Sequence, residues 1–217
     1  MYYYILELRA MIKSVISDLG KVIIFFDNHI FFRKIEKYCP YSLSEILNKV
    51  ARNMELVSSF DKGRITPVEF YRKVKKTLKA KIDFEQFYAI YNDIFWLNPP
   101  VLEILKKLRP QYRLILLSNT DQMRFSFITK KLPQILLFDA YVLSFEVGYM
   151  KPESEIYHIA LEKAEAPAAE CLFIDDRQEN IEAAQRIGIN CIHFQAETNL
   201  QVELKKRGLN LEKEESK

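Results

Sequence analysis

The chain has 217 residues, of which 49% are hydrophobic and 28% are charged. It can therefore bury a substantial core, and its composition excludes an intrinsically disordered protein. The formal net charge of +3 is too small to indicate a nucleic-acid partner. The length suits one α/β domain with an elaboration, or two small domains.

The cysteines show no paired spacing. There are three of them: Cys39, Cys171 and Cys191. This argues against a disulfide framework or a zinc site and favours a reducing compartment. The apolar residues 1–6 are too few to span a bilayer, and Glu7 and Arg9 interrupt them. We therefore expect a soluble cytoplasmic protein with no membrane partner.

The first predicted strand covers residues 11–17 and ends at Asp18, with Gly20 two residues later. Such a strand presents a carboxylate at the carboxyl edge of a sheet, where open α/β sheets bind ligands. Because glycine has no Cβ, its carbonyl can approach a bound ion closely. The two groups form half of an oxygen site suited to Mg²⁺, and the carboxylate could also act as a nucleophile. In isolation this pattern is better explained as an ordinary turn, so the hypothesis depends on residues further along the chain.

A second apolar stretch, residues 22–26, ends at Asp27 and competes with the first. Asn28 and His29 follow it without a glycine, so Asp27 or Asn28 is better explained as the cap of the next helix. We therefore assign the catalytic position to Asp18.

The pattern of residues 28–97 is helical, without a convincing strand. Ser42, Thr66 and Asp83 each precede Glu or Gln by three residues, which predicts capping boxes. With the helix after residue 28 they predict four helices. This insert follows the first strand, where a cap over the sheet edge would be attached, and we assign residues 26–97 to a helical cap domain.

From residue 98 onward strands and helices alternate, which is typical of a parallel sheet. The expected strands lie at residues 113–117, 140–143, 171–174 and 190–194. The expected helices begin near residues 99, 121, 153 and 177, and one more lies in the charged tail after residue 197. We assign residues 11–25 and 98–217 to one α/β core domain.

Three of the predicted strands end in polar residues, namely Asp18, Ser118 and the pair Asp175-Asp176. The carboxyl ends of parallel strands lie on one edge, so these side chains are expected to converge. Lys151 enters from a loop ahead of a helix. Carboxylates can hold a cation there, while a hydroxyl and an ammonium neutralise phosphoryl oxygens. The sequence therefore predicts a phosphate-and-metal site at this edge.

Four segments, in this order, resemble the haloacid dehalogenase superfamily: residues 16–22, 116–120, 147–153 and 173–181. The chain is most similar to its small sugar-phosphate phosphatase branch, and the resemblance covers about residues 11–195. The resemblance implies a Rossmann-like, three-layer α/β core with an inserted helical-bundle cap. It also implies Mg²⁺-dependent hydrolysis of a phosphate monoester, such as a sugar phosphate, through an aspartyl-phosphate intermediate. The implied partner is a small phosphorylated metabolite.

The resemblance also implies residue roles. Asp18 would be the nucleophile and a metal ligand, and Gly20 would offer its carbonyl to Mg²⁺. Lys151 would stabilise both the nucleophile and the phosphate. Two further pairs complete the set: Ser118 and Asn119 would hold the phosphoryl group, and Asp176, with Asp175 beside it, would bind the metal.

This chain departs from the family pattern at three positions. Ser17 replaces the usual phenylalanine before the nucleophile, which is a packing change. Lys21 replaces an asparagine beside the metal loop, where a cation could compete with Mg²⁺ or help to hold phosphate. Gly20 stands where most superfamily phosphatases have a second aspartate for general acid catalysis.

Other interpretations stay open at this point. Asp176 could cap a helix, because Glu179 follows it with capping-box spacing. The protein could also be a metal-independent dehalogenase of the same superfamily, although the paired acids argue against this. A catalytically silent homologue that binds a phosphate ligand or a protein is the remaining alternative, and Lys21 is its main support.

Overall fold

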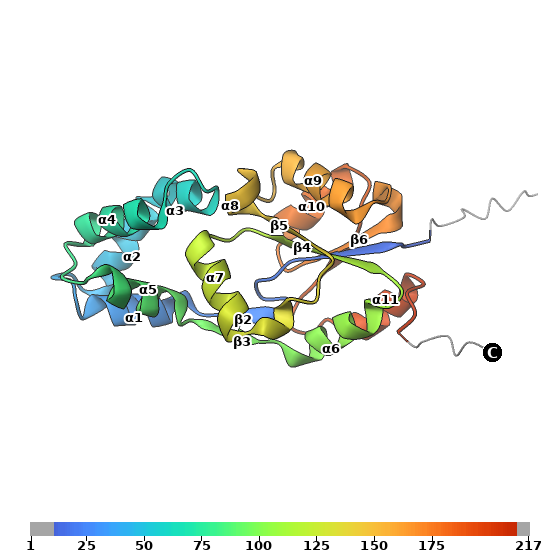
Figure 1. Ribbon diagram of the computed structural model, residues 1–217, viewed down its shortest axis with the longest axis horizontal. Helices are drawn as coiled ribbons and strands as arrows, with labels where there is room; N and C mark the ends of the chain where they lie inside the picture. The colour runs from blue at the N-terminus through green and yellow to red at the C-terminus, as the bar shows by residue number, and fades with distance from the viewer. Residues whose placement is uncertain (1–10, 212–217) are drawn as a thin grey trace, which may run out of the picture.

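The core of the protein is a five-stranded parallel sheet. The computed structural model describes residues 11–211. The expectation that residues 1–6 do not span a bilayer therefore lies outside the described part. Within it the strand order is β5-β4-β1-β6-β7, with β1 at the centre (Figure 1). The strands are β1 Ser14–Ser17, β4 Arg113–Ser118, β5 Ala140–Leu143, β6 Cys171–Asp175 and β7 Asn190–His193.

Helices cover both faces of this sheet, which confirms the Rossmann-like α/β fold predicted from the sequence. Because both faces are buried, the strands are almost continuously apolar. Val15, Leu114 and Leu116 contribute to one apolar cluster, and their neighbours Ile16 and Ile115 contribute to the other. The face of the sheet that carries Val15 packs against α6 Pro99–Leu108, α7 Gln122–Lys131 and α11 Leu200–Lys206. The face that carries Ile16 packs against α9 Ser154–Ala164 and α10 Gln178–Arg186. The shorter turns are η1 Pro133–Ile135, α8 Ser144–Val147 and η2 Ala168–Glu170.

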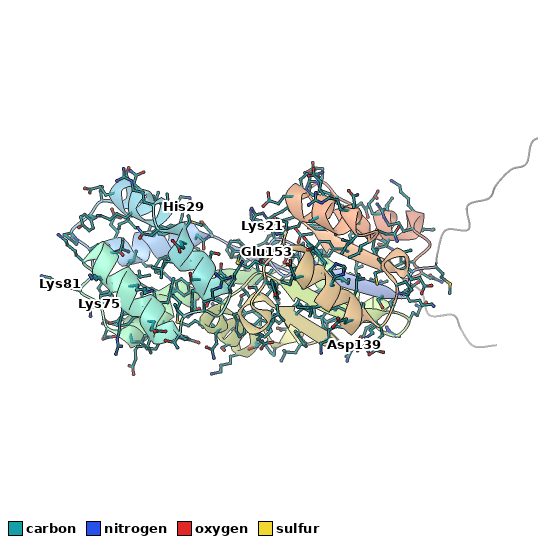
Figure 2. All side chains as sticks on the ribbon, turned by 90° about the horizontal axis from the view of Figure 1, so that it is seen from above. Lys21, His29, Lys75, Lys81, Asp139 and Glu153 are labelled. Carbon is teal, nitrogen blue, oxygen red and sulfur yellow. The ribbon has the colours of Figure 1, made fainter. Side chains whose placement is uncertain are left out.

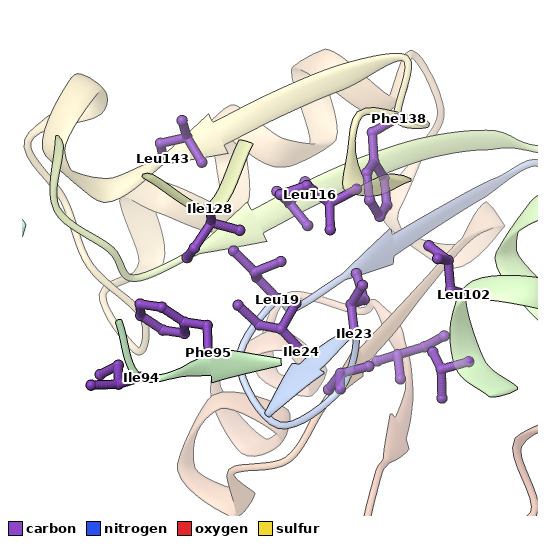
Figure 3. Close-up of a cluster of buried hydrophobic side chains, with 14 of the residues drawn as sticks. Leu19, Ile23, Ile24, Ile94, Phe95, Leu102, Leu116, Ile128, Phe138 and Leu143 are labelled. Carbon is purple, nitrogen blue, oxygen red and sulfur yellow. The ribbon is translucent and has the colours of Figure 1, made fainter. Parts of the chain in front are cut away.

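A two-stranded antiparallel ribbon joins β2 Ile24–Phe26 to β3 Phe95–Leu97. The expectation of no strand in residues 28–97 was therefore wrong. A run of three residues carries no periodicity of its own, and its partner lies about 70 residues earlier in the chain, so local patterning could not identify it. Figure 3 shows apolar side chains of this region gathered with those of the sheet domain, among them Leu19, Ile24, Phe95 and Ile128.

Five helices lie within residues 28–92, all of which are described: α1 Asn28–Glu36, α2 Leu43–Ala51, α3 Met54–Asp61, α4 Pro67–Leu78 and α5 Phe84–Asn92. The sequence predicted four, because the break between α2 and α3 at Asn53 carries no side-chain cap. The predicted capping boxes at Ser42, Thr66 and Asp83 are present, and Asp27 caps α1. These helices form a group beside the sheet domain (Figure 1), and residues 26–97 remain our proposal for a cap domain. None of the helices in the described range is long and apolar enough to cross a bilayer.

The turn after α3 brings the helical segment into close contact with the sheet domain. Gly63 has φ +66°, and a Cβ built there would lie 2.0 Å from the carbonyl oxygen of Phe145 in α8. Beside this contact, Lys62 pairs with Glu153 at 2.5 Å. Only a residue without a side chain therefore allows the two backbones to approach this closely.

Gly63→Ala is expected to lower the free energy of unfolding by about 2–4 kcal/mol, from the left-handed backbone and the clash together. Urea unfolding would measure it. Gly208→Ala is the matched control, because Gly208 has φ +79° and open space around its Cβ position, so it should lose only about 1 kcal/mol. Equal losses in the two variants would contradict the proposed close contact.

Candidate active site

The three central strands bring the predicted site residues to one edge of the sheet. β1 pairs with β4 on one side and with β6 on the other, so Asp18, Ser118 and Asp175 follow or end adjacent parallel strands. The amide of Asp18 donates to the carbonyl of Ile174 at 2.8 Å, which extends the β1–β6 pairing to the aspartate itself. Topology alone therefore explains why residues that are distant in the sequence share one site.

Lys151 lies at the centre of this edge. Its Nζ donates to Asp18 Oδ1 at 2.6 Å, to Asp175 Oδ2 at 2.7 Å and to the carbonyl of Leu117 at 3.1 Å. The lysine side chain is only 2% exposed, and an ammonium buried to this extent needs such partners. The position and orientation of the Asp18 carboxylate are therefore fixed by a buried cation.

Asn119 holds the loop that carries this lysine. Its Nδ2 donates to the carbonyl of Lys151 at 2.8 Å, and its Oδ1 accepts the Lys151 amide at 2.8 Å. The side-chain amide is thus committed to the loop. The residue also lines the cavity that contains Asp18 and Lys151, which we call the catalytic cavity. In contrast, Ser118 is a buried residue whose hydroxyl forms no hydrogen bond with residues 11–211.

The two adjacent aspartates have different environments. Asp175 is fully buried, and its Oδ1 accepts from the Arg177 amide at 2.8 Å and from Asn180 Nδ2 at 2.9 Å. Asp176 keeps 19% of its side chain exposed and lines the cavity. The alternative role of Asp176 as a helix cap was wrong, because α10 begins after Arg177 and has no side-chain cap bond.

These residues fit a divalent cation with oxygen ligands. Asp18, Asp175 and Asp176 each offer a carboxylate oxygen, and these oxygens lie within 4.8 Å of one another. Asn180 adds an Oδ1 that is buried without a hydrogen-bond partner among the described residues, and its side chain lines the same cavity. Asn180 is not among the site residues predicted from the sequence. Oxygen donors of this kind and number are those that Mg²⁺ prefers.

At Gly20 there is little space for a side chain. A Cβ at this position would lie 3.0 Å from the ring of Phe26 and 3.9 Å from Asp18 Oδ2. The backbone of Gly20 therefore lies directly beside the carboxylate, where its carbonyl could approach an ion.

The charges of the site shift its pKa values. Burial raises the pKa of Asp18 to about 7, with Lys151 opposing the rise and Asp175 adding to it. Burial also disfavours the Lys151 ammonium, but the two carboxylates outweigh it and raise the pKa of Lys151. Burial and Asp175 raise the pKa of Asp176, while Lys21 opposes this. Three acids around one buried ammonium leave an excess of negative charge, which a divalent cation would neutralise.

Lys21 lies at the rim of the site. Its Nζ is 3.8 Å from Asp176 Oδ2, and 59% of its side chain is exposed. Figure 2 labels Lys21 and Glu153, which lie in the middle of the molecule, between the helical segment and the sheet domain. The lysine backbone is left-handed, with φ +57°, a conformation that asparagine adopts more readily.

Lys21→Met is expected to tighten Mg²⁺ binding by about twofold to tenfold, because it removes a partly screened positive charge near a candidate ligand. Titration calorimetry with Mg²⁺ would measure the affinity. Methionine keeps the chain length and the left-handed strain, and Lys21→Arg restores the charge as a control. Equal Mg²⁺ affinities in all three proteins would rule out an electrostatic effect of Lys21 on the metal.

A buried polar network that the sequence did not reveal links α5 to α7. Tyr91 donates to Asp121 Oδ2 at 2.9 Å, and Arg124 donates to Asn28 Oδ1 at 3.2 Å while lying over the Tyr91 ring. Burial raises the pKa of the nearby Asp61 to about 7, with Asp121 adding to the rise. The network joins the helical segment to the segment that follows Ser118.

The fold and the site define the class of the protein as a Rossmann-like α/β enzyme. The sequence profile of the haloacid dehalogenase-like hydrolases matches residues 9–188, and the chain belongs to this family.

Two curated relatives are phosphatases by name. A D-ribitol-5-phosphate phosphatase of Bacteroides thetaiotaomicron is 23% identical over 190 residues, which cover 82% of this chain and 89% of the relative. A sesquiterpene phosphatase of Aspergillus oryzae is 25% identical over 146 residues, which cover 65% and 74% of the two chains.

Among solved structures, a HAD family enzyme of Bacteroides thetaiotaomicron in complex with magnesium and inorganic phosphate superposes with a TM-score of 0.76. It is 26% identical, and the match covers 88% of this chain and 98% of that one.

Proposed function

We propose that the protein is a Mg²⁺-dependent phosphatase that hydrolyses a small phosphate monoester through an aspartyl-phosphate on Asp18. The observation that carries the proposal is the buried Lys151 Nζ, held 2.6 Å from Asp18 Oδ1 and 2.7 Å from Asp175 Oδ2. The phosphatase names of its relatives, and the magnesium and phosphate in the similar structure, support the same chemistry.

The proposed reaction has two steps. A carboxylate oxygen of Asp18 attacks phosphorus, which forms the acyl phosphate and breaks the bond to the leaving oxygen, and that oxygen then takes a proton from the site or from solvent. Water next attacks the phosphorus of the aspartyl-phosphate, which releases inorganic phosphate and restores the carboxylate. Lys151 keeps the nucleophile oriented and offsets the charge that gathers near the phosphoryl oxygens.

The remaining residues hold the phosphate and the cofactor. Asp18, Asp176 and the Gly20 carbonyl would ligate Mg²⁺, while Asp175, whose oxygens already accept three hydrogen bonds, would position Lys151 and the loop after β6. When bound, Mg²⁺ would neutralise phosphoryl-oxygen charge. The Ser118 hydroxyl would donate a hydrogen bond to the phosphoryl group. Asn119 would contact the phosphoryl group through its backbone, and its side chain would hold the loop that carries Lys151.

Hydrolysis of 4-nitrophenyl phosphate is expected with Mg²⁺, to be lost with excess EDTA and to return when Mg²⁺ is added back. Absorbance of the released nitrophenolate would measure it. Steady-state turnover that is unaffected by EDTA would contradict the proposed metal dependence. The absence of turnover under all conditions would contradict the proposed phosphatase activity.

A catalytically silent phosphate-binding homologue is the second candidate, because Lys21 lies 3.8 Å from Asp176. Beryllium fluoride with Mg²⁺ should raise the melting temperature in either case, so turnover separates the two. The metal-independent dehalogenase is disfavoured because three carboxylates converge at the site. The free thiols at positions 39, 171 and 191 support the proposed cytoplasmic location.

A further inference from the structure

A groove extends from the catalytic cavity along the outer side of the β2–β3 ribbon. The cavity that contains Asp18 and Lys151 has a volume of about 360 Å³, and the adjoining groove has about 730 Å³. Lys21, Phe26 and Asp176 line both of them. A molecule whose phosphate lies beside Asp18 can therefore continue into this groove.

The walls of the groove are mainly apolar. Trp96 forms part of the wall and is 48% exposed, with its ring centroid 6.2 Å from that of Phe25. The other apolar wall residues include Phe26, Val101, Ile104 and Phe194. Its charged lining residues, Lys21 and Asp176, lie at the end shared with the catalytic cavity. The charge pattern thus suits a ligand with an anionic head and an apolar body.

Three of the polar side chains along the groove are engaged with the protein. Asn98 Nδ2 donates to the carbonyl of Val22 at 2.8 Å, the Thr198 hydroxyl accepts the Gln195 amide at 2.8 Å, and Asn199 Oδ1 accepts the Val202 amide at 3.2 Å. A polyol that lies against the apolar wall would lose water hydrogen bonds that this wall cannot replace. An apolar skeleton has no hydrogen bonds with water to lose, and it would cover the exposed aromatic surface of the groove wall.

We propose that this groove binds the leaving group of the substrate, and that the leaving group is an apolar carbon skeleton, so that the substrate is an amphipathic phosphate monoester. This inference rests on the proposed phosphatase function and specifies its substrate class. A second apolar cavity of about 250 Å³ lies within the helical segment, but it shares no lining residue with the catalytic cavity. It provides an internal comparison.

The test uses ethyl, butyl and hexyl phosphate with Mg²⁺. In the wild-type protein kcat/KM is expected to rise about twofold to fourfold per added methylene, according to how completely each is buried. Trp96→Ala should flatten this rise, lowering kcat/KM for hexyl phosphate about tenfold while ethyl phosphate changes less than about twofold. Trp96→Gln is a second variant that keeps a long side chain in β3, and circular dichroism would verify the fold of both.

Met54→Ala is the matched control, because Met54 is 56% exposed and lines the separate cavity of the helical segment. Its chain-length dependence should match that of the wild type. A flat dependence in the wild type, an unchanged one in both Trp96 variants, or a loss in Met54→Ala would each overturn the groove assignment.

A binding measurement separates this inference from the proposed function. Ethyl- and hexylphosphonate, which cannot be hydrolysed at the P–C bond, would be titrated calorimetrically into the wild type and Trp96→Ala with Mg²⁺ present. A hexyl preference that depends on Trp96, without turnover of any phosphate, would retain the groove and reject the phosphatase. Turnover of ethyl phosphate without any hexyl preference would retain the phosphatase and reject the groove.

Discussion

Asp18→Asn is expected to lower kcat by about 10⁴-fold or more, because the substitution removes the proposed nucleophile and leaves the other site residues in place. The amide is nearly the same size as the carboxylate, and its oxygen can still accept from Lys151 Nζ, which is 2.6 Å from Asp18 Oδ1. Burial already raises the pKa of Asp18 to about 7, so a neutral group is tolerated there. The fold should therefore survive, which thermal unfolding followed by circular dichroism would verify.

Asp27→Asn is the matched control for this experiment. Asp27 also follows a short apolar strand, but its side chain accepts from the His29 amide and caps α1. Because asparagine caps a helix about as well as aspartate, kcat should stay within about twofold of the wild type. Full activity in Asp18→Asn, or an equal loss in both variants, would remove Asp18 from its proposed role.

The convergence of the candidate residues at one edge of the sheet could be predicted from the sequence, because it follows from strand order. Once Asp18 and Ser118 are placed at the ends of parallel strands, the sheet brings them together without any side-chain information. Lys151 could be included because its loop precedes a helix and resembles a family segment. The capping boxes were predictable for a related reason, since each depends on only four consecutive residues.

The features that the sequence did not predict depend on contacts between distant segments. Asp175 and Asp176 are the same residue type, and the sequence does not distinguish their environments. Asp175 ends β6 and is buried among Lys151, Asn180 and the Arg177 amide. The Asn119 side chain bonds to the backbone of Lys151, which lies 32 residues later in the chain, so local patterning could not reveal this contact. The groove beside β3 is lined by residues 21–26, 96–104 and 194–201 and by Asp176, which lie in separate parts of the chain.

Lys151→Met is expected to lower both stability and activity. The lysine side chain is 2% exposed and that of Asp175 is fully buried, so the variant leaves buried carboxylates without their cation. Breaking a buried ion pair from one side costs about 3–5 kcal/mol of the free energy of unfolding. Loss of one preorganised charge at the reacting group should lower kcat by a further factor of about 10²–10³. Urea unfolding and steady-state kinetics would measure the two effects separately.

Two comparisons test whether the buried charges cause this loss. Lys106→Met breaks the exposed pair with Glu103 by the same substitution, and it should change stability by less than about 1 kcal/mol. The double variant Lys151→Met/Asp175→Asn removes one of the carboxylates that the single variant leaves unpaired, and it should recover part of the lost stability without recovering activity. If the double variant were no more stable than the single one, lost packing of the lysine chain would explain the effect instead. Because an unpaired buried charge costs far more than an unpaired neutral amide, recovery in the double variant would identify the ammonium of Lys151 as the group that keeps this acidic site folded.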